Sequence, residues 1–336
     1  MFLCRAQTVF SRGYYFKTSF PIDGTGGTTR ISKRLVEGIF SWLVQGLDSA
    51  ILPLIATAVV LSAMIVRRAE PSRAIFGRWA LWICVSCGTA ILLSKSEISS
   101  KPTWSLALFC MLLWLFIETV YNWLAIDAIS RSGMPLFPSY KRCEGCGQWP
   151  ADKAFIKLRE LLRKLGFKSV GAAVGQIDGV DYLRINLFEN ALGSTRLSLL
   201  FMPRGQSSLS VFYSLATLGE KGERVVTDNV FIPFGGFYPD NVYLERHPLV
   251  RSLSRLMKIH DRRVEKSGIN QIAWNVDAID DMNAQQDITE RLNVNLGFLV
   301  DPAEREERGI ISRVGRYRLW SELWTLNYLG KPKNYC

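Results

Sequence analysis

Three long runs of uncharged residues in the first part of the chain constrain its fold more than any other feature. Ser49–Val66 holds eighteen residues, Trp79–Ser94 sixteen, and Thr103–Ile126 twenty-four with Glu118 as its single charge. A helix needs about 20 mostly apolar residues to cross about 30 Å of hydrocarbon. The second run reaches that length if Arg78 extends its guanidinium toward the lipid headgroups.

The residues that flank these runs favour lipid over a soluble core. Basic residues bound each run, and aromatic residues lie near the ends, as interfacial anchors do: Trp79, Trp82, Trp104, Tyr121 and Trp123. We therefore predict three transmembrane helices.

The basic residues also predict an orientation. Three spans place segment 67–78 and everything after residue 127 on one side of the membrane. Seven Lys or Arg lie near the membrane on that side and five on the other. Cytoplasmic flanks collect Lys and Arg, so we predict a cytoplasmic C-terminal part. The two sets are Arg67, Arg68, Arg73, Arg78, Arg131, Lys141 and Arg142, against Arg30, Lys33, Arg34, Lys95 and Lys101.

The N-terminal segment 1–48 precedes the first run. Its first 22 residues contain Arg5, Arg12 and Lys17 and no acid. This composition fits a transit peptide, which would place the protein in an organelle membrane, and it equally fits a short basic tail. Residues 31–47 predict an interfacial amphipathic helix that leads into the first span.

After residue 127 the pattern becomes that of an α+β domain. Helical spacing predicts a helix over 151–165 that ends at Gly166. Five stretches then alternate polar and apolar residues and are separated by short glycine-containing turns, which predicts an antiparallel meander without parallel neighbours. The stretches are 169–176, 180–189, 195–203, 207–217 and 223–232.

A loop at 233–241 precedes helical patterns at 248–266, 276–296 and 302–329, the last broken near Gly309 or Gly315. The predicted fold class is thus three transmembrane α-helices followed by a soluble α+β domain with an N-terminal helix, a five-stranded antiparallel meander and C-terminal helices. The predicted divisions are 1–48, 49–128, a linker at 129–150, and 151–336.

Composition excludes several classes of protein. The chain is 48% hydrophobic and 21% charged, which excludes disorder throughout. Seven cysteines in 336 residues are too few for a disulfide-stapled scaffold. Residues 136–336 contain 28 basic and 23 acidic residues, so the net charge of +5 argues against nucleic acid as a partner.

Cys143 and Cys146 form a CxxCG motif in the predicted linker. Two thiolates at this spacing can hold one side of a tetrahedral zinc site, although no further ligands lie nearby in sequence. A redox pair and two inert thiols are the alternatives. We predict no other cofactor.

A second candidate site contains both histidines of the chain. His247, His260, Asp261 and Asp277 resemble the histidine and aspartate ligand set of metal-dependent phosphohydrolases, in which the metal activates water. The resemblance is loose in spacing, and that family is an all-helical bundle, whereas these residues follow a β-meander. It implies a membrane-bound metal-dependent hydrolase.

Two further features carry charge. Arg251, Arg255, Lys258 and Arg262 follow one stripe of the helix predicted over 248–266. This stripe predicts contact with anionic headgroups, and a solvated face is the alternative. Glu118 lies inside the third run, where a carboxylate must face a partner, reach water or serve an ion site.

The last helical pattern holds two kinds of residue at regular spacing. Tyr317, Trp320, Leu323 and Trp324 predict an aromatic core stripe, and the polar residues predict surface ion pairs: Glu304, Arg308, Arg316 and Glu322. The function these features favour is that of a multi-pass membrane-anchored binding, scaffold or sensor protein. It would act through its C-terminal domain on an unidentified protein partner or a second copy.

Overall fold

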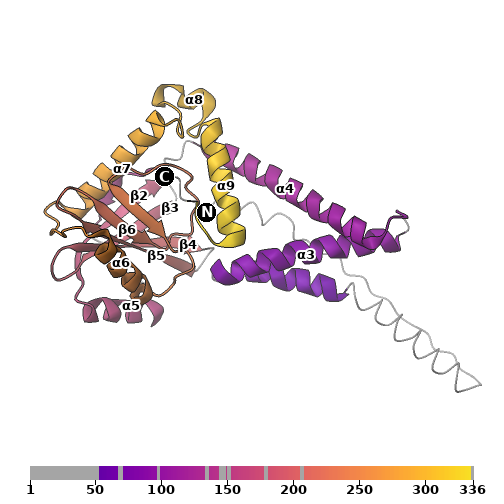
Figure 1. The fold of residues 1–336 in the computed structure, drawn as a ribbon, viewed down its shortest axis with the longest axis horizontal. Helices are drawn as coiled ribbons and strands as arrows, with labels where there is room; N and C mark the ends of the chain where they lie inside the picture. Colours follow the sequence, from indigo (N-terminus) through magenta and orange to yellow (C-terminus); the bar gives the residue numbers. More distant parts are fainter. Residues whose placement is uncertain are drawn as a thin grey trace, which may run out of the picture. The chain divides into compact units, whose positions relative to one another are not determined.

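A computed structural model describes residues 53–66, 71–96, 99–132, 136–143, 149, 153–177, 181–204 and 208–333. The chain divides into two compact units, Met1–Thr119 and Val120–Cys336, which are described separately (Figure 1). The second unit is called the C-terminal domain below. The predicted transit peptide and the predicted helix over 31–47 lie outside the described residues.

The first unit holds apolar helices. Among the described residues, two helices are long and apolar enough to cross a membrane. They are α3, Pro71–Lys95, and α4, Thr103–Arg131, and their most apolar windows have mean hydropathies of 1.6 and 1.8. The first predicted span is represented by a shorter helix, Pro53–Val66. Two spans, and not three, therefore meet the length criterion within the described residues.

The side chains of these two helices are largely exposed. Only 28% of the apolar window of α3 is buried, and only 11% of that of α4. Large apolar side chains such as Trp104 and Phe116 are 72% and 64% exposed. A core helix of a soluble protein would bury most of such a surface, because exposed apolar area is costly in water.

The C-terminal domain is built on a seven-stranded mixed sheet with strand order β1-β2-β3-β4-β5-β6-β7 (Figure 1). Strands β2 to β6 form the predicted antiparallel meander. Strands β1 and β7 were not predicted, and β7 runs parallel to β6. The bounds are β1 Tyr140–Arg142, β2 Lys168–Ile177, β3 Asp181–Glu189, β4 Thr195–Arg204, β5 Ser208–Leu218, β6 Arg224–Asp228 and β7 Val242–Arg246.

There is a physical reason why each of these two strands was not predicted. Strand β1 has three residues, which is too short for a visible alternation, and it lies in the predicted linker. Strand β7 has five residues and follows the predicted loop at 233–241. The segment 229–241 is long enough to carry the chain to a parallel neighbour without a helix, so the expectation of a purely antiparallel sheet was wrong.

Helices cover both faces of the sheet. On one face, α5, Lys153–Lys164, and α6, Leu253–Ser267, bury apolar side chains against Leu197, Leu199 and Leu215. On the other face, α7, Ala278–Asn295, packs through Ala278 and Ile279 against β2 and β3. Helix α5 matches the predicted helix, and Gly166 follows it with a φ of 75°, as a C-terminal stop requires.

A third apolar cluster joins the end of α4 to α9, Arg313–Leu329, through Ile126, Phe298, Leu299, Ile311 and Leu319. Short helices η3, Pro302–Glu304, and α8, Arg305–Arg308, precede α9. The predicted break occurs at Gly309, whereas Gly315 lies inside α9, where a Cβ atom would lie 2.2 Å from the carbonyl oxygen of Phe298.

Polar contacts tie the same two helices together. Arg316 of α9 donates to the Asp127 carboxylate of α4. The Ser130 hydroxyl donates to the Ile311 carbonyl over 3.3 Å and accepts from its N–H over 2.9 Å. The last turns of α4 are therefore part of the core of the C-terminal domain.

Candidate functional site

The loop between β6 and β7 is held by side chains from distant elements. Asn293 of α7 accepts from the N–H of Phe237 and donates to its carbonyl, both over 2.8 Å. Gly235 has a φ of 68°, and a Cβ atom there would lie 2.7 Å from the Leu319 backbone nitrogen. Glycine is therefore required where this loop passes α9.

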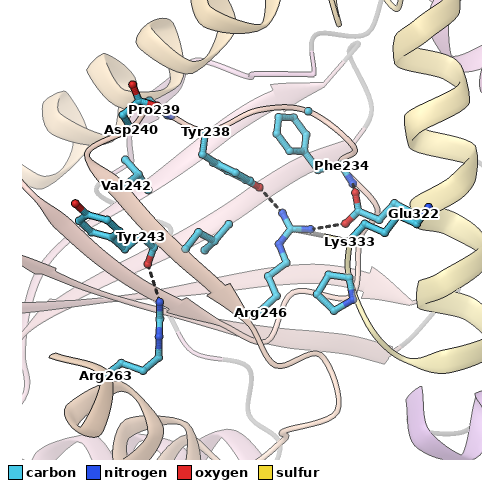
Figure 2. Close-up of a pocket in the computed structure, with 13 residues that line it drawn as sticks. Phe234, Tyr238, Pro239, Asp240, Val242, Tyr243, Arg246, Arg263, Glu322 and Lys333 are labelled. Atoms are coloured by element: carbon cyan, nitrogen blue, oxygen red, sulfur yellow. Dashed lines mark hydrogen bonds and ion pairs between the residues drawn. The ribbon is translucent and has the colours of Figure 1, made fainter. Parts of the chain in front are cut away.

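Arg246, at the end of β7, lies between this loop and α9 (Figure 2). Its guanidinium donates to the Tyr238 hydroxyl over 2.6 Å, to the Ile232 carbonyl over 3.0 Å and to the Glu322 carboxylate over 3.3 Å. Its Nε lies 3.6 Å from a carboxylate oxygen of Asp228 and makes no hydrogen bond among the described residues. These four side chains, Asp228, Tyr238, Arg246 and Glu322, are called the open cluster below.

The acids of the open cluster are buried. Glu322 lies on α9 and accepts from the backbone N–H groups of Phe234 and Gly235. Burial raises the pKa of Glu322 and raises the pKa of Asp228 to about 6, although Arg246 lowers both. Burial also raises the pKa of the Tyr238 hydroxyl. A carboxyl group whose pKa is raised by burial in the wall of a cleft, as that of Glu322 is, is typical of functional sites.

Three members of the open cluster, Tyr238, Arg246 and Glu322, line a pocket of about 440 Å³ (Figure 2), whereas Asp228 is not part of its wall. This volume lies within the range of small-molecule sites, about 300–1,000 Å³. Aromatic and aliphatic side chains from the loop and β7 form one part of the wall, and charged side chains form the rest. The lining includes Phe234, Tyr238, Val242, Tyr243, Leu244, Arg246, Arg263, Glu322 and Lys333.

A second buried charge cluster lies elsewhere in the domain and touches no described pocket. Arg196 of β4 donates to Glu189 over 2.7 Å and to Asp281 over 3.1 Å, and Arg224 binds Asp281 through both of its Nη atoms. The two guanidinium carbons lie 4.2 and 5.0 Å from the centre of the Trp274 ring. These five side chains are called the closed cluster.

The predicted hydrolase residues do not converge. His260 is 1% exposed, and its two ring nitrogens lie 2.9 Å from the Thr217 hydroxyl and 3.0 Å from the Thr227 hydroxyl. Asp261, the next residue of α6, is exposed. Both nitrogens of His260 are thus occupied, and burial lowers its pKa to about 4.

The other two hydrolase residues have separate partners. His247 lies 2.9 Å from the Glu245 carboxylate, and Asp277 caps the N-terminus of α7 and pairs with Arg142. The described part of the chain holds no group of three or more His, Cys, Asp and Glu residues that could hold a metal ion. The geometry gives the predicted hydrolase centre no support.

The predicted CxxC metal site falls partly outside the described residues. Cys143 is disulfide-bonded, so its sulfur is not a thiolate that could bind zinc in this structure. Its N–H donates to the Ala172 carbonyl beside β1. Cys146 lies outside the described residues.

The basic stripe is placed on α6 as the sequence indicates. Arg255, Lys258 and Arg262 are exposed, whereas Arg251 precedes the helix and lies over the Phe212 ring at 5.6 Å. Headgroup contact stays a prediction. Glu118 of α4 accepts from the indole N–H of Trp114 over 3.2 Å, one turn away on the same helix.

Two expectations for the last helices need correction. Arg308 and Glu304 form the predicted surface pair, but Glu322 is 2% exposed and belongs to the open cluster. Arg316 pairs with Asp127 and is also largely buried. Of the predicted aromatic core stripe, Leu323 is 5% exposed and Trp320 packs against the third apolar cluster, whereas Tyr317 is 59% exposed.

Sequence reasoning missed the open cluster because its members are spread over four segments of the chain. Arg246 and Glu322 lie 76 positions apart. The available signal was the Gly235–Gly236 pair in an aromatic loop, which indicates a close approach of backbone to another element. No family model, no curated protein and no solved structure matches this chain.

Proposed function

We propose that this protein is a membrane-anchored binding protein whose C-terminal domain holds a small ligand in the pocket beside the open cluster. The observation that carries the proposal is a pocket of about 440 Å³ whose wall contains a buried, incompletely hydrogen-bonded arginine. Pockets that bind small molecules combine apolar walls with a few placed polar groups, as this one does.

The anchor consists of α3 and α4, whose apolar side chains are mostly exposed. With two spans, the sequence before α3 and the C-terminal domain share one side of the membrane. Arg73, Arg78 and Arg131 flank the spans on that side, and Lys95 and Lys101 on the other. The positive-inside rule places the C-terminal domain in the cytoplasm. A reporter fused after Tyr335 that is active only outside the cytoplasm would contradict this orientation.

The pocket wall defines the class of ligand. Phe234, Val242 and Tyr243 offer apolar and aromatic surface to a flat body. Arginine has five N–H donors, and three contacts of Arg246 are taken by Tyr238, Ile232 and Glu322. One N–H of Nη2 is left for an acceptor on the ligand, because the buried Nε–H lies 3.6 Å from the Asp228 carboxylate. The ligand is therefore a small molecule with a planar apolar part and one hydrogen-bond-accepting group, such as a carboxylate.

The test is a fragment screen of the full-length protein in lipid nanodiscs. The probes are fluorinated aromatic carboxylates and matched aromatic amines, observed by fluorine NMR relaxation. We expect carboxylates to bind the wild type and to be lost with Leu244→Trp, which fills the pocket. Leu249→Trp is the matched control, because Leu249 is 44% exposed and lies outside the pocket lining.

Two results would contradict the proposal. The first is that no fragment binds the wild-type protein. The second is that binding persists unchanged in Leu244→Trp, which would place the fragments at another surface. A protein partner or a second copy stays a separate prediction, because the described surfaces favour neither.

A further inference from the structure

Helix α9 carries two apolar stripes, of which one is fully buried and the other, aromatic stripe is only partly covered by the core. Leu319, Leu323 and Leu326 are buried on one side. At about 3.6 residues per turn, Tyr317, Trp320 and Trp324 lie on the opposite side. Tyr317 stacks on Trp320 with 5.8 Å between ring centres, and Trp320 lies 6.4 Å from Trp324.

This second stripe, with the neighbouring Val314, is called the aromatic face. Val314 and Tyr317 are 63% and 59% exposed and lie beside the partly exposed Trp320 ring. The Trp320 and Trp324 rings are half-buried, and their indole nitrogens are enclosed within the domain. Partly exposed tryptophan and tyrosine rings beside a span are typical of the boundary between headgroups and acyl chains.

The position of α9 within the C-terminal domain identifies the surface that this face can meet. The first turn of α9 lies against the last turns of α4, through the Arg316–Asp127 pair and the contacts of Ser130. Trp104 and Trp123 lie nineteen residues apart on α4, about 28 Å along the helix, which matches the thickness of the hydrocarbon core. Asp127 follows Trp123 by one turn and pairs with Arg316, so the first turn of α9 lies next to the part of α4 that follows its last tryptophan.

The charges at this end of both helices suit a phospholipid surface. Arg313, in the first turn of α9, is exposed, and the Arg131 side chain at the end of α4 is 68% exposed. Basic side chains beside a span interact favourably with lipid phosphates. The other face of α9 presents Glu322 to the open cluster, so one helix links the aromatic face to the pocket.

We propose that the aromatic face of α9, formed by Val314, Tyr317, Trp320 and Trp324, lies in the headgroup–acyl boundary of the bilayer that α4 spans. This inference rests on the membrane anchor of the proposed function. It adds an interfacial helix that carries a pocket residue, and it names phospholipid as the partner of that surface.

The experiment uses the full-length protein with fluorinated tryptophan in lipid nanodiscs. Trp320 and Trp324 resonances are assigned from the signals that disappear in Trp320→Phe and Trp324→Phe. A lipid with a spin label near the top of its acyl chain is then added. We expect both resonances to be lost to paramagnetic broadening, while the resonance of Trp274, whose ring packs on the two arginines of the closed cluster, is retained.

Trp114, in the middle of α4, separates the two proposals. A lipid labelled near the end of its acyl chain removes the Trp114 resonance if α4 spans the bilayer. If Trp114 is lost while Trp320 and Trp324 behave as Trp274 does, the anchor is right and the interfacial position of α9 is wrong. If Trp114 is also retained, the anchor fails, and the inference fails with it.

Discussion

The closed and open clusters are built from the same kinds of side chain, namely arginines, carboxylates and an aromatic ring, but they differ in how completely these groups are paired. In the closed cluster each carboxylate meets at least one guanidinium in short hydrogen bonds, and the Trp274 ring covers both arginines. In the open cluster a single arginine contacts two carboxylates, with Nη1 at 3.3 Å from Glu322 and Nε at 3.6 Å from Asp228. One cluster is complete within the protein, whereas the other lies in the wall of a pocket.

This difference in pairing distinguishes buried charges that stabilise the fold from buried charges that can bind a ligand. A buried ion pair is tolerated when every donor and acceptor finds a partner. Where a buried donor beside a cavity has no partner within the protein, we infer that the donor is available to a ligand. The predictions below test this distinction in order of expected size.

The largest effect is expected in the closed cluster. Replacing Arg196 with leucine leaves Glu189 and Asp281 buried beside an apolar side chain, so the free energy of unfolding should fall by about 3–5 kcal/mol. Denaturant unfolding of the full-length protein, followed by circular dichroism, measures it. Arg142→Leu is the control, because the Arg142–Asp277 pair is 53% and 36% exposed and should cost about 0–1 kcal/mol.

Arg246→Leu should cost less, about 1–3 kcal/mol, because Asp228 can take up a proton and water can reach Glu322 from the pocket. The same variant should lose carboxylate fragment binding. A loss of stability equal to that of Arg196→Leu, with fragment binding intact, would mean that both clusters are structural.

The third prediction concerns pH. The pKa of Asp228 is raised to about 6 from its ordinary 3.8, so the folded protein holds this proton more tightly and Asp228 favours folding increasingly as pH falls from 6 to 4. The pKa of His260 is lowered to about 4 from 6.5, so His260 disfavours folding over the same fall. The two effects oppose each other in the wild type.

Single variants separate these opposing effects. Asp228→Asn should lose stability as pH falls from 6 to 4, and His260→Gln should gain it, by about 1–3 kcal/mol each. Thermal melting across this range gives both slopes. Two variants with identical slopes would show that neither group titrates as its burial requires.

The smallest effect is expected from charges that are neither buried nor enclosed. Replacing Arg255, Lys258 and Arg262 by glutamine should change stability by less than about 0.5 kcal/mol per residue. If this stripe contacts headgroups, the variant should bind vesicles containing phosphatidylserine more weakly. Neutral phosphatidylcholine vesicles should show no difference.

The matched control removes the same charge from other exposed positions, Lys221, Arg291 and Lys331. An equal loss of vesicle binding in both triple variants would indicate attraction by net charge alone. The basic stripe would then be a solvated face.

The local alternation of polar and apolar residues predicted those strands whose period is fixed by burial of one face. Strand β3 was predicted because Leu183, Ile185 and Leu187 alternate with polar residues over a long stretch, and burial of one face fixes that period. Strand β7 has the same alternation in Val242 and Leu244, but five residues beside a glycine-rich loop carry too little signal.

The open cluster and the aromatic face could not be predicted from the spacing of residues along the chain. Helical spacing puts Tyr317, Trp320 and Trp324 on one stripe but does not say which stripe of α9 is the core, because Leu319 and Leu326 form another. Glu322 resembles a surface acid in sequence. Its burial depends on backbone N–H groups 87 and 88 positions away, which no local pattern contains.

The contact between α4 and α9 has a consequence for the order of events during biosynthesis. Asp127 and Arg316 are separated by 189 positions, so α4 leaves the ribosome long before its partner helix exists. Chains fold from their N-terminal side as they are made. The meander can pair through its local turns in the meantime, while Ser130 and Ile126 still lack their partners in the segment 298–319. The contacts of the last turns of α4 are therefore completed only when α9 has been translated.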